Sequence, residues 1–121
     1  MNEILFRGDE HKSFFSALLK SMGVSEHDVY RRALAYLIAL DADCRKHVFS
    51  IYDFENDCII PDALEAEWIT GGSRRTLELA FNLYNGYCGA DAVDIFSYGD
   101  YNVYYVQALK IRFPSACWAG R

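Results

Sequence analysis

Hydrophobic residues recur with the period of an α-helix over most of this chain. In the first such stretch the apolar positions are three or four residues apart: Phe14, Phe15, Leu18, Leu19 and Met22. Asp9 precedes this stretch and Gly23 follows it, so we predict a helix over 10–22. Its apolar residues share one side, which indicates that the helix covers a core.

The second amphipathic stretch is the most regular in the chain. Its apolar residues again fall on one side of a helix: Val29, Tyr30, Ala33, Leu34, Leu37 and Ile38. Ser25 and Asp28 form an S-x-x-D pattern in front of it, which is typical of a helix start. We therefore predict the longest helix of the chain here.

The middle of the chain alternates between helical and irregular patterns. A third, shorter helix is predicted over about 41–49, and the Asn-Asp turn between β-prone runs in 50–61 favours a short hairpin or an ordered loop. Pro61 starts a helical turn that continues to Trp68. The fifth helix begins at the interruption over 70–73 and ends at Asn85, where Gly86 supplies a left-handed stop.

The C-terminal third is less regular. Glycine, alanine and aspartate over 88–99 indicate a loop, with one short strand where apolar and polar residues alternate in 93–96. The last helix is predicted over 101–112 and ends before Pro114. The fold class expected is mainly α: a compact single domain over 1–121 with about five to six helices and a short hairpin or ordered loops.

Composition narrows the function classes. About half of the residues are apolar and 16% are aromatic, more than a small core needs. We therefore expect aromatic residues at a subunit interface or in a ligand pocket, and we expect a homo-oligomer. A net charge of -5 argues against a general DNA- or RNA-binding surface. The absence of an apolar run of membrane-spanning length and of a cationic, apolar leader predicts a cytoplasmic protein without a membrane partner.

The sequence offers little that supports catalysis or metal binding. The cysteines lack C-x-x-C spacing and are expected to be reduced and mostly buried thiols: Cys44, Cys58, Cys88 and Cys117. The histidines are dispersed without a nucleophile at motif spacing and are expected on the surface: His11, His27 and His47. The acidic run over 53–57 lacks the glycine and final glutamate of a calcium-binding loop. We therefore expect no catalytic residue, no metal ligand and no cofactor.

The segment Thr70-Gly71-Gly72-Ser73-Arg74-Arg75 is the most informative local feature. A glycine-containing loop leads into a helix start that carries two arginines. Free backbone N–H groups, the positive end of the helix and guanidinium donors all favour an anionic group there. The alternative is that Ser73 is only a helix cap and that the arginines pair with acidic neighbours such as Glu65 or Glu67.

The same helix suggests an aromatic ligand contact. At 100° per residue its core-facing stripe is Leu79, Ala80, Leu83, Tyr84 and Tyr87. Phe81 falls on the opposite, polar side, where it could stack on a base while Asn82 or Asn85 reads the base edge and Arg74 or Arg75 binds phosphate. The alternative is that Phe81 packs against another helix or a second subunit.

The last helix adds one more candidate. Arg112 lies near its C-terminus, where a cation most simply complements the helix dipole. The same side chain could instead deliver charge to a ligand.

Several segments together resemble a family of small phage and prophage proteins, the Thoeris anti-defence sponges. The resemblance spans most of the chain and is carried by these runs: Phe6-Arg7-Gly8-Asp9-Glu10-His11-Lys12, Tyr52-Asp53-Phe54-Glu55, Trp68 to Arg75, Leu79 to Tyr87 and Ala108 to Pro114. It implies a non-enzymatic protein that sequesters glyco-cyclic ADP-ribose, with cyclic di- or trinucleotides captured at a separate site in some relatives. It also implies assembly as a dimer or hexamer, in the host cytoplasm if the protein is phage-encoded.

The leading hypothesis is therefore a protein that binds a cyclic nucleotide signal without cleaving it. Its ligand-binding residues would be Phe81, Arg74, Arg75, Asn82, Asn85 and Arg112, and Phe81 and Arg112 fit the pattern of the resembling family best. Two rivals stay open. One is a protein–protein inhibitor that blocks a host defence factor through an acidic, aromatic surface, and the other is a nucleotide-processing enzyme with an unfamiliar site.

Overall fold

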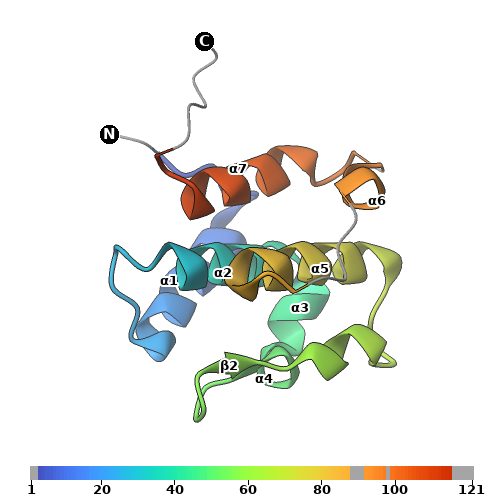
Figure 1. The fold of residues 1–121 in the computed structure, drawn as a ribbon, viewed down its shortest axis with the longest axis horizontal. Helices are drawn as coiled ribbons and strands as arrows, with labels where there is room; N and C mark the ends of the chain where they lie inside the picture. Colours follow the sequence, from blue (N-terminus) through green and yellow to red (C-terminus); the bar gives the residue numbers. More distant parts are fainter. Residues whose placement is uncertain (1–2, 88–91, 98, 116–121) are drawn as a thin grey trace.

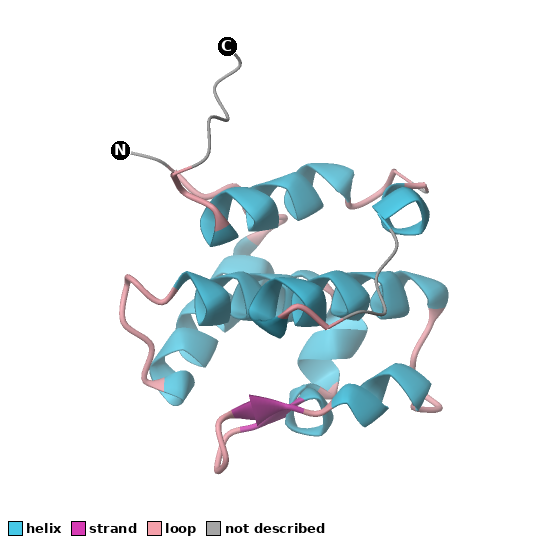
Figure 2. Cartoon of the chain, in the orientation of Figure 1, coloured by secondary structure: helices cyan, strands magenta, loops and turns pink. Residues whose placement is uncertain are grey.

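The computed structural model describes residues 3–87, 92–97 and 99–115, and these residues are mainly helical (Figures 1 and 2). In chain order the elements are α1 (Asp9–Met22), α2 (Val29–Leu40), α3 (Ala42–Lys46), α4 (Val48–Ile51), β1 (Tyr52–Asp53), β2 (Cys58–Ile59), the 3-10 helix η1 (Pro61–Glu65), α5 (Gly71–Asn85), α6 (Ala92–Phe96) and α7 (Asn102–Arg112). The predicted fold class, a small helical domain with a short hairpin, is confirmed.

Helix α2 is the centre of the core. Every residue over 33–40 is fully buried, because this part of α2 is apolar on all sides and no face of it favours water. Helices α1, α5 and α7 pack against it. In Figure 1, α2 and α5 occupy the middle level, α7 lies above them, and α4 and the hairpin lie below. Residues far apart in the sequence thus meet around α2.

The helix ends follow the predicted glycines but not all of the predicted caps. Gly23 and Gly86 adopt left-handed backbone, with φ of 66° and 78°, and they end α1 and α5 as expected. Asp28, not Ser25, caps α2, since its carboxylate accepts a hydrogen bond from the backbone N–H of Arg31 at 3.1 Å. Ser25 instead accepts from the backbone N–H of His27.

Three predicted elements differ from the structure. The helix expected over 41–49 is divided at His47 into α3 and α4. The run 93–96 is part of helix α6, not a strand, so its short apolar alternation was misleading. The longest helix is α5, with 15 residues, rather than α2, with 12. The hairpin is confirmed as an antiparallel pair that matches Tyr52 with Ile59.

The cysteines and histidines meet the predictions only in part. Cys44 is a buried free thiol and Cys58 an exposed one, whereas Cys88 and Cys117 lie outside the described residues. His27 is exposed, but His11 is buried in contact with α2, so its predicted surface position was wrong. Within the described part of the chain, no helix is long and apolar enough to cross a membrane.

A polar pocket at the start of helix α5

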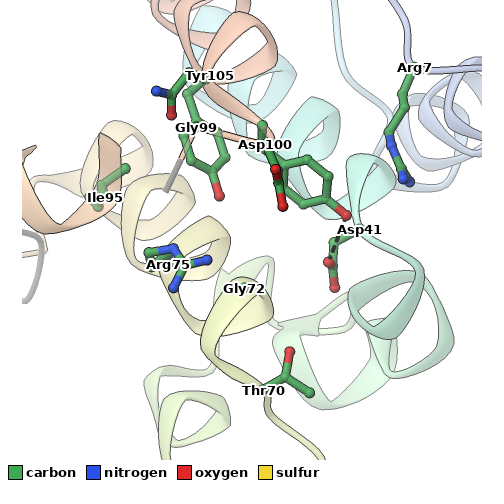
Figure 3. Close-up of a pocket in the computed structure, with 11 residues that line it drawn as sticks. Arg7, Asp41, Thr70, Gly72, Arg75, Ile95, Gly99, Asp100 and Tyr105 are labelled. Carbon is green, nitrogen blue, oxygen red and sulfur yellow. Dashed lines mark hydrogen bonds between the residues drawn. The ribbon is translucent and has the colours of Figure 1, made fainter. Parts of the chain in front are cut away.

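A pocket of about 490 Å³ lies where the start of α5 meets the start of α7 and the segment before α1 (Figure 3). Arginine, aspartate and tyrosine side chains reach it from four separate parts of the chain. Its lining residues are Arg7, Asp41, Thr70, Gly72, Arg75, Ile95, Gly99, Asp100, Tyr101, Asn102 and Tyr105. Its volume falls within the range typical of sites for small molecules.

The first turn of α5 forms one wall of this pocket. Thr70 caps the helix, because its hydroxyl accepts a hydrogen bond from the backbone N–H of Ser73 at 3.2 Å. The Arg75 side chain folds back over the two glycines that follow. A Cβ at Gly71 would lie 3.4 Å from Nη1 of Arg75, and one at Gly72 would lie 3.8 Å from Nη2.

This arrangement concentrates positive charge at one place. The first-turn N–H groups carry the positive end of the helix dipole, and the Arg75 guanidinium lies directly beside them. The carboxylates of Asp41 and Asp100 line the same pocket and supply negative charge there. The start of α5 is the part of this mixed-charge pocket that suits an anionic group.

Arg7 contributes a second guanidinium from the segment before α1. It lies over the ring of Tyr101, 5.2 Å from the ring centroid. The backbone N–H of Arg7 donates to Nδ1 of His11 at 3.0 Å, and Nε2 of His11 donates to the carbonyl oxygen of Tyr36 at 2.9 Å. His11 thereby ties the segment that carries Arg7 to α2.

The hydrogen bonds of His11 require its neutral form. Nδ1 must accept a hydrogen bond while Nε2 donates one, so a proton on Nδ1 would break the contact with Arg7. The pKa of His11 is lowered to about 4, chiefly by burial and also by the positive charges of Arg45 and Arg7, against the hydrogen bond to Tyr36, which raises it. At neutral pH the Arg7 segment is consequently held in place.

Asp41 supplies a buried carboxylate to the same pocket. It caps α3 through the backbone N–H of Cys44, which donates to Oδ2 at 3.1 Å. The hydroxyl of Ser73 donates to the same oxygen at 2.8 Å. The hydroxyl of Tyr101 donates to Oδ1 at 3.3 Å. Asp41 thus joins α3, α5 and the start of α7 around the pocket.

Two tyrosines complete the polar lining. The Tyr105 hydroxyl is hydrogen-bonded to that of Thr76 at 2.8 Å, and burial raises the pKa of Tyr105. Burial also raises the pKa of Tyr101, and the negative charge of Asp41 raises it further. Both phenols therefore stay protonated at neutral pH. Tyr101 donates its proton to Asp41, and Tyr105 donates its own to Thr76, whose hydroxyl in turn donates to the carbonyl oxygen of Gly72.

Comparison with known proteins places the chain in a family but gives that family no activity. Residues 1–120 match the family of unknown function DUF6075. The chain belongs to this family. No curated protein and no solved structure matches it. The function of this DUF6075 member must therefore be inferred from its own residues.

Of the two adjacent arginines predicted to bind phosphate, the structure brings only Arg75 to the pocket. Arg74 lies outside it, where its guanidinium contacts the carbonyl oxygen of Leu64 and carboxylate oxygens of Glu65 and Glu78, each carboxylate at 3.4 Å. The pairing with Glu65 that the sequence offered as an alternative is therefore the one observed. The other alternative, Ser73 as the helix cap, is replaced by Thr70.

The predicted position of Phe81 on a polar, ligand-facing side of α5 is wrong. Its side chain is fully buried and packs edge-on against Tyr87, with the ring centroids 6.0 Å apart. Helix α5 contacts α2, α7, α6 and η1, so more than one of its sides is covered. Phe81 is a core residue that presents no ring face to a ligand in this structure.

The two predicted asparagines stabilise the end of α5 instead of lining the pocket. Asn82 donates through Nδ2 to the carbonyl oxygen of Tyr87 at 3.1 Å. Asn85 accepts through its side-chain oxygen from the backbone N–H of Tyr87 at 3.0 Å. Both amides hold the chain as it leaves the helix after Gly86.

Arg112 likewise lies at the C-terminal end of α5. Its Nε donates to the carbonyl oxygen of Leu83 at 2.8 Å, and its guanidinium lies 3.8 Å from the centroid of the Tyr30 ring. It thus satisfies a carbonyl in the last turn of α5 and complements the negative end of that helix. The interpretation of Arg112 as a dipole-complementing cation is favoured, although the helix it complements is α5 as well as its own.

The sequence pattern missed the pocket residues outside the start of α5, which are Arg7, Asp41, Ile95, Gly99, Asp100, Tyr101, Asn102 and Tyr105. Arg7 stands in the opening run that carries part of the family resemblance, but no local spacing links it to α5. Among the described residues, no group of three or more histidine, cysteine, aspartate or glutamate side chains could hold a metal ion.

Proposed function

We propose that this protein binds a small phosphate-bearing ligand in the pocket at the start of α5 and releases it chemically unchanged. The observation that carries the proposal is the position of the Arg75 guanidinium against Gly71 and Gly72, at the positive end of the helix. Arg7 adds a second guanidinium to the same pocket. A phosphate there would be bound by charge-assisted hydrogen bonds from side chains and backbone together.

The ligand class we propose is a cyclic nucleotide signal such as glyco-cyclic ADP-ribose. The resemblance to the anti-defence sponges supports it, and so does a volume of about 490 Å³, which suits a small molecule. Sequestration requires slow release but no reacting group. The pocket would then hold the ligand without reacting with it, with Arg7 and Arg75 bound to the phosphates.

Isothermal titration with glyco-cyclic ADP-ribose tests this proposal, and neighbouring arginines provide a matched control. Arg75→Gln should weaken binding by about tenfold or more, because a charge-assisted contact is lost. Arg74→Gln removes the same charge one position earlier, outside the pocket, and should change the affinity by less than about twofold. Equal effects of the two variants, or no binding to the unaltered protein, would contradict the proposal.

The mass of the released ligand distinguishes binding without reaction from catalysis. Ligand released by heating the complex should have the mass of the molecule that was added. Recovery of a cleaved product would show an enzyme instead.

A second candidate function is inhibition of a host defence factor by direct protein contact. It is favoured by apolar side chains that α6 and α7 leave exposed: Val93 is 79% exposed and Val103 58% exposed. Val103→Asp should then abolish capture of the factor and leave titration of the nucleotide unchanged. The same exposed side chains are where self-association into a dimer or hexamer would be sought, by sedimentation of the unaltered protein.

A further inference from the structure

The two oxygens of the Asp41 carboxylate are engaged to different degrees. Oδ2 accepts the Ser73 hydroxyl at 2.8 Å and the Cys44 backbone N–H at 3.1 Å. Oδ1 accepts the Tyr101 hydroxyl at 3.3 Å, which is longer than the roughly 2.6 Å typical of a hydroxyl bound to a carboxylate. A carboxylate oxygen has more than one acceptor site, so Oδ1 retains capacity for a better donor.

The environment of Asp41 keeps this oxygen in a fixed position. Asp41 is 6% exposed and lines the pocket, and the bonds to Oδ2 join it to α3 and α5. The carboxylate therefore cannot turn away when a ligand enters. A preorganised acceptor of this kind recognises a donor at low entropic cost.

A purely anionic ligand does not suit the whole pocket. Arg7 and Arg75 attract negative charge, but the carboxylates of Asp41 and Asp100 repel it and accept hydrogen bonds. The ligand part that lies beside Asp41 must carry an O–H or N–H group. The pocket thus combines a site for an anion with a site for a donor.

We propose that Asp41 makes the pocket selective for ligands that carry a hydroxyl group beside a phosphate, as a phosphorylated ribose does. This inference rests on the proposed function, since it assumes that the phosphate lies at Arg7 and Arg75. The ligand hydroxyl donates to Oδ1 of Asp41 and takes the place of the long hydrogen bond from Tyr101.

Titration with ribose 5-phosphate and with methyl phosphate tests the inference, because only the first carries hydroxyl groups. The unaltered protein should bind ribose 5-phosphate about tenfold more tightly, the gain expected from one hydrogen bond to a charged group. In Asp41→Asn the ratio of the two affinities should fall to about one. Affinity for methyl phosphate should be unchanged or higher, because a negative charge has left the pocket.

Asp41→Asn is a conservative test of the carboxylate. Asparagine caps helices as well as aspartate does, and its oxygen can keep the bonds to Ser73 and Cys44 while its amide nitrogen faces the Tyr101 hydroxyl. Tyr101→Phe serves as an independent variant, and it decides the matter if Asp41→Asn fails to fold. It removes the competing donor, so the preference for ribose 5-phosphate should rise about two- to threefold.

The outcomes distinguish this inference from the proposed function. A preference for ribose 5-phosphate that survives Asp41→Asn, or one that Tyr101→Phe leaves unchanged, would overturn the role of Asp41. If Arg75→Gln still weakens the binding of methyl phosphate in that case, the proposed phosphate site is supported. If methyl phosphate does not bind, or binds equally to Arg75→Gln, the proposed function fails and the inference fails with it.

Discussion

The two ends of α5 differ in how their polar groups are satisfied. At the N-terminal end, Thr70 caps the helix, and the Arg75 guanidinium lies over the first turn beside a pocket of about 490 Å³. At the C-terminal end, Asn85 bonds the chain that leaves the helix and Arg112 bonds the Leu83 carbonyl. One end places Arg75 beside a cavity that arginine and aspartate side chains line, whereas the other end is closed by an asparagine of α5 and by Arg112 of α7.

This difference shows why the same residue types have different roles along one helix. An arginine at a helix C-terminus neutralises the partial charge it meets, so it stabilises the fold without a ligand. An arginine folded over a helix N-terminus adds to the partial charge it meets, so an anion lowers its energy. Position relative to the dipole therefore separates Arg75 from Arg112 as candidates for ligand binding.

The largest expected effect comes from the closed end, at Phe81. Phe81→Ala should lower the free energy of unfolding by about 3–5 kcal/mol, the usual cost of a cavity left by a fully buried phenylalanine. Phe81→Leu should cost less, about 1–2 kcal/mol, because most of the volume is kept. Urea unfolding measures both. An alanine variant of normal stability that no longer binds nucleotide would contradict the contrast between the two ends, because Phe81 would then belong to the ligand site.

The next largest effect on stability concerns His11, whose hydrogen bonds hold the segment that carries Arg7 against α2. The pKa of His11 is about 4 in the folded protein and 6.5 in the unfolded chain, so between these values the unfolded chain binds more protons. The contribution of His11 to stability is complete above about pH 7 and is lost as the pH falls from 6.5 to 4, by about 3 kcal/mol in total. Unfolding measured at a series of pH values should show this loss.

His11→Asn separates this effect from the titration of carboxylates. The variant should be less stable at pH 7, and its stability should change less between pH 6.5 and 4.5 than that of the unaltered protein. Parallel pH curves for the two proteins would show that His11 is not the titrating group.

The helices were largely predictable because local signals set their bounds. The break over 70–73 and Gly86 mark the two ends of α5, and Gly23 ends α1. Phe81 was misplaced for a physical reason. A single periodic stripe identifies the buried side of a helix that packs on one side, whereas α5 contacts α2, α7, α6 and η1. On such a helix an isolated aromatic residue opposite the main stripe is still a core residue.

The pocket was predictable only at α5. The segment over 70–75 indicated an anion site from local geometry alone, and Thr70, Gly72 and Arg75 do line the cavity. Arg7 and Asp41 reach it because α2 brings distant segments together, and no spacing in the sequence records that contact. Arg74 could not be separated from Arg75 either, since their difference lies in the side-chain direction around the helix.

A smaller effect is expected at Arg112. Arg112→Met keeps much of the side-chain packing against Tyr30 but removes the bond to the Leu83 carbonyl and the cation–π contact, so it should cost about 2 kcal/mol. Lys110→Met, on the exposed side of α7, is the control and should change stability by less than about 0.5 kcal/mol. Nucleotide affinity should be the same in both variants. Loss of nucleotide affinity in Arg112→Met alone would indicate that the ligand binds at the C-terminal end of α5.

The smallest effect is expected at Thr70, the cap of the N-terminal end of α5. Thr70→Ala removes the acceptor for the Ser73 N–H and should cost about 1 kcal/mol, whereas Thr70→Ser keeps a hydroxyl and should cost close to nothing. The first turn also forms a wall of the pocket, so fraying of that turn in Thr70→Ala should weaken phosphate binding as well. Titration with methyl phosphate checks this coupling. If Thr70→Ala destabilises the protein but binds methyl phosphate normally, the first turn stabilises the helix without taking part in phosphate binding. The two ends of α5 would then not differ in function.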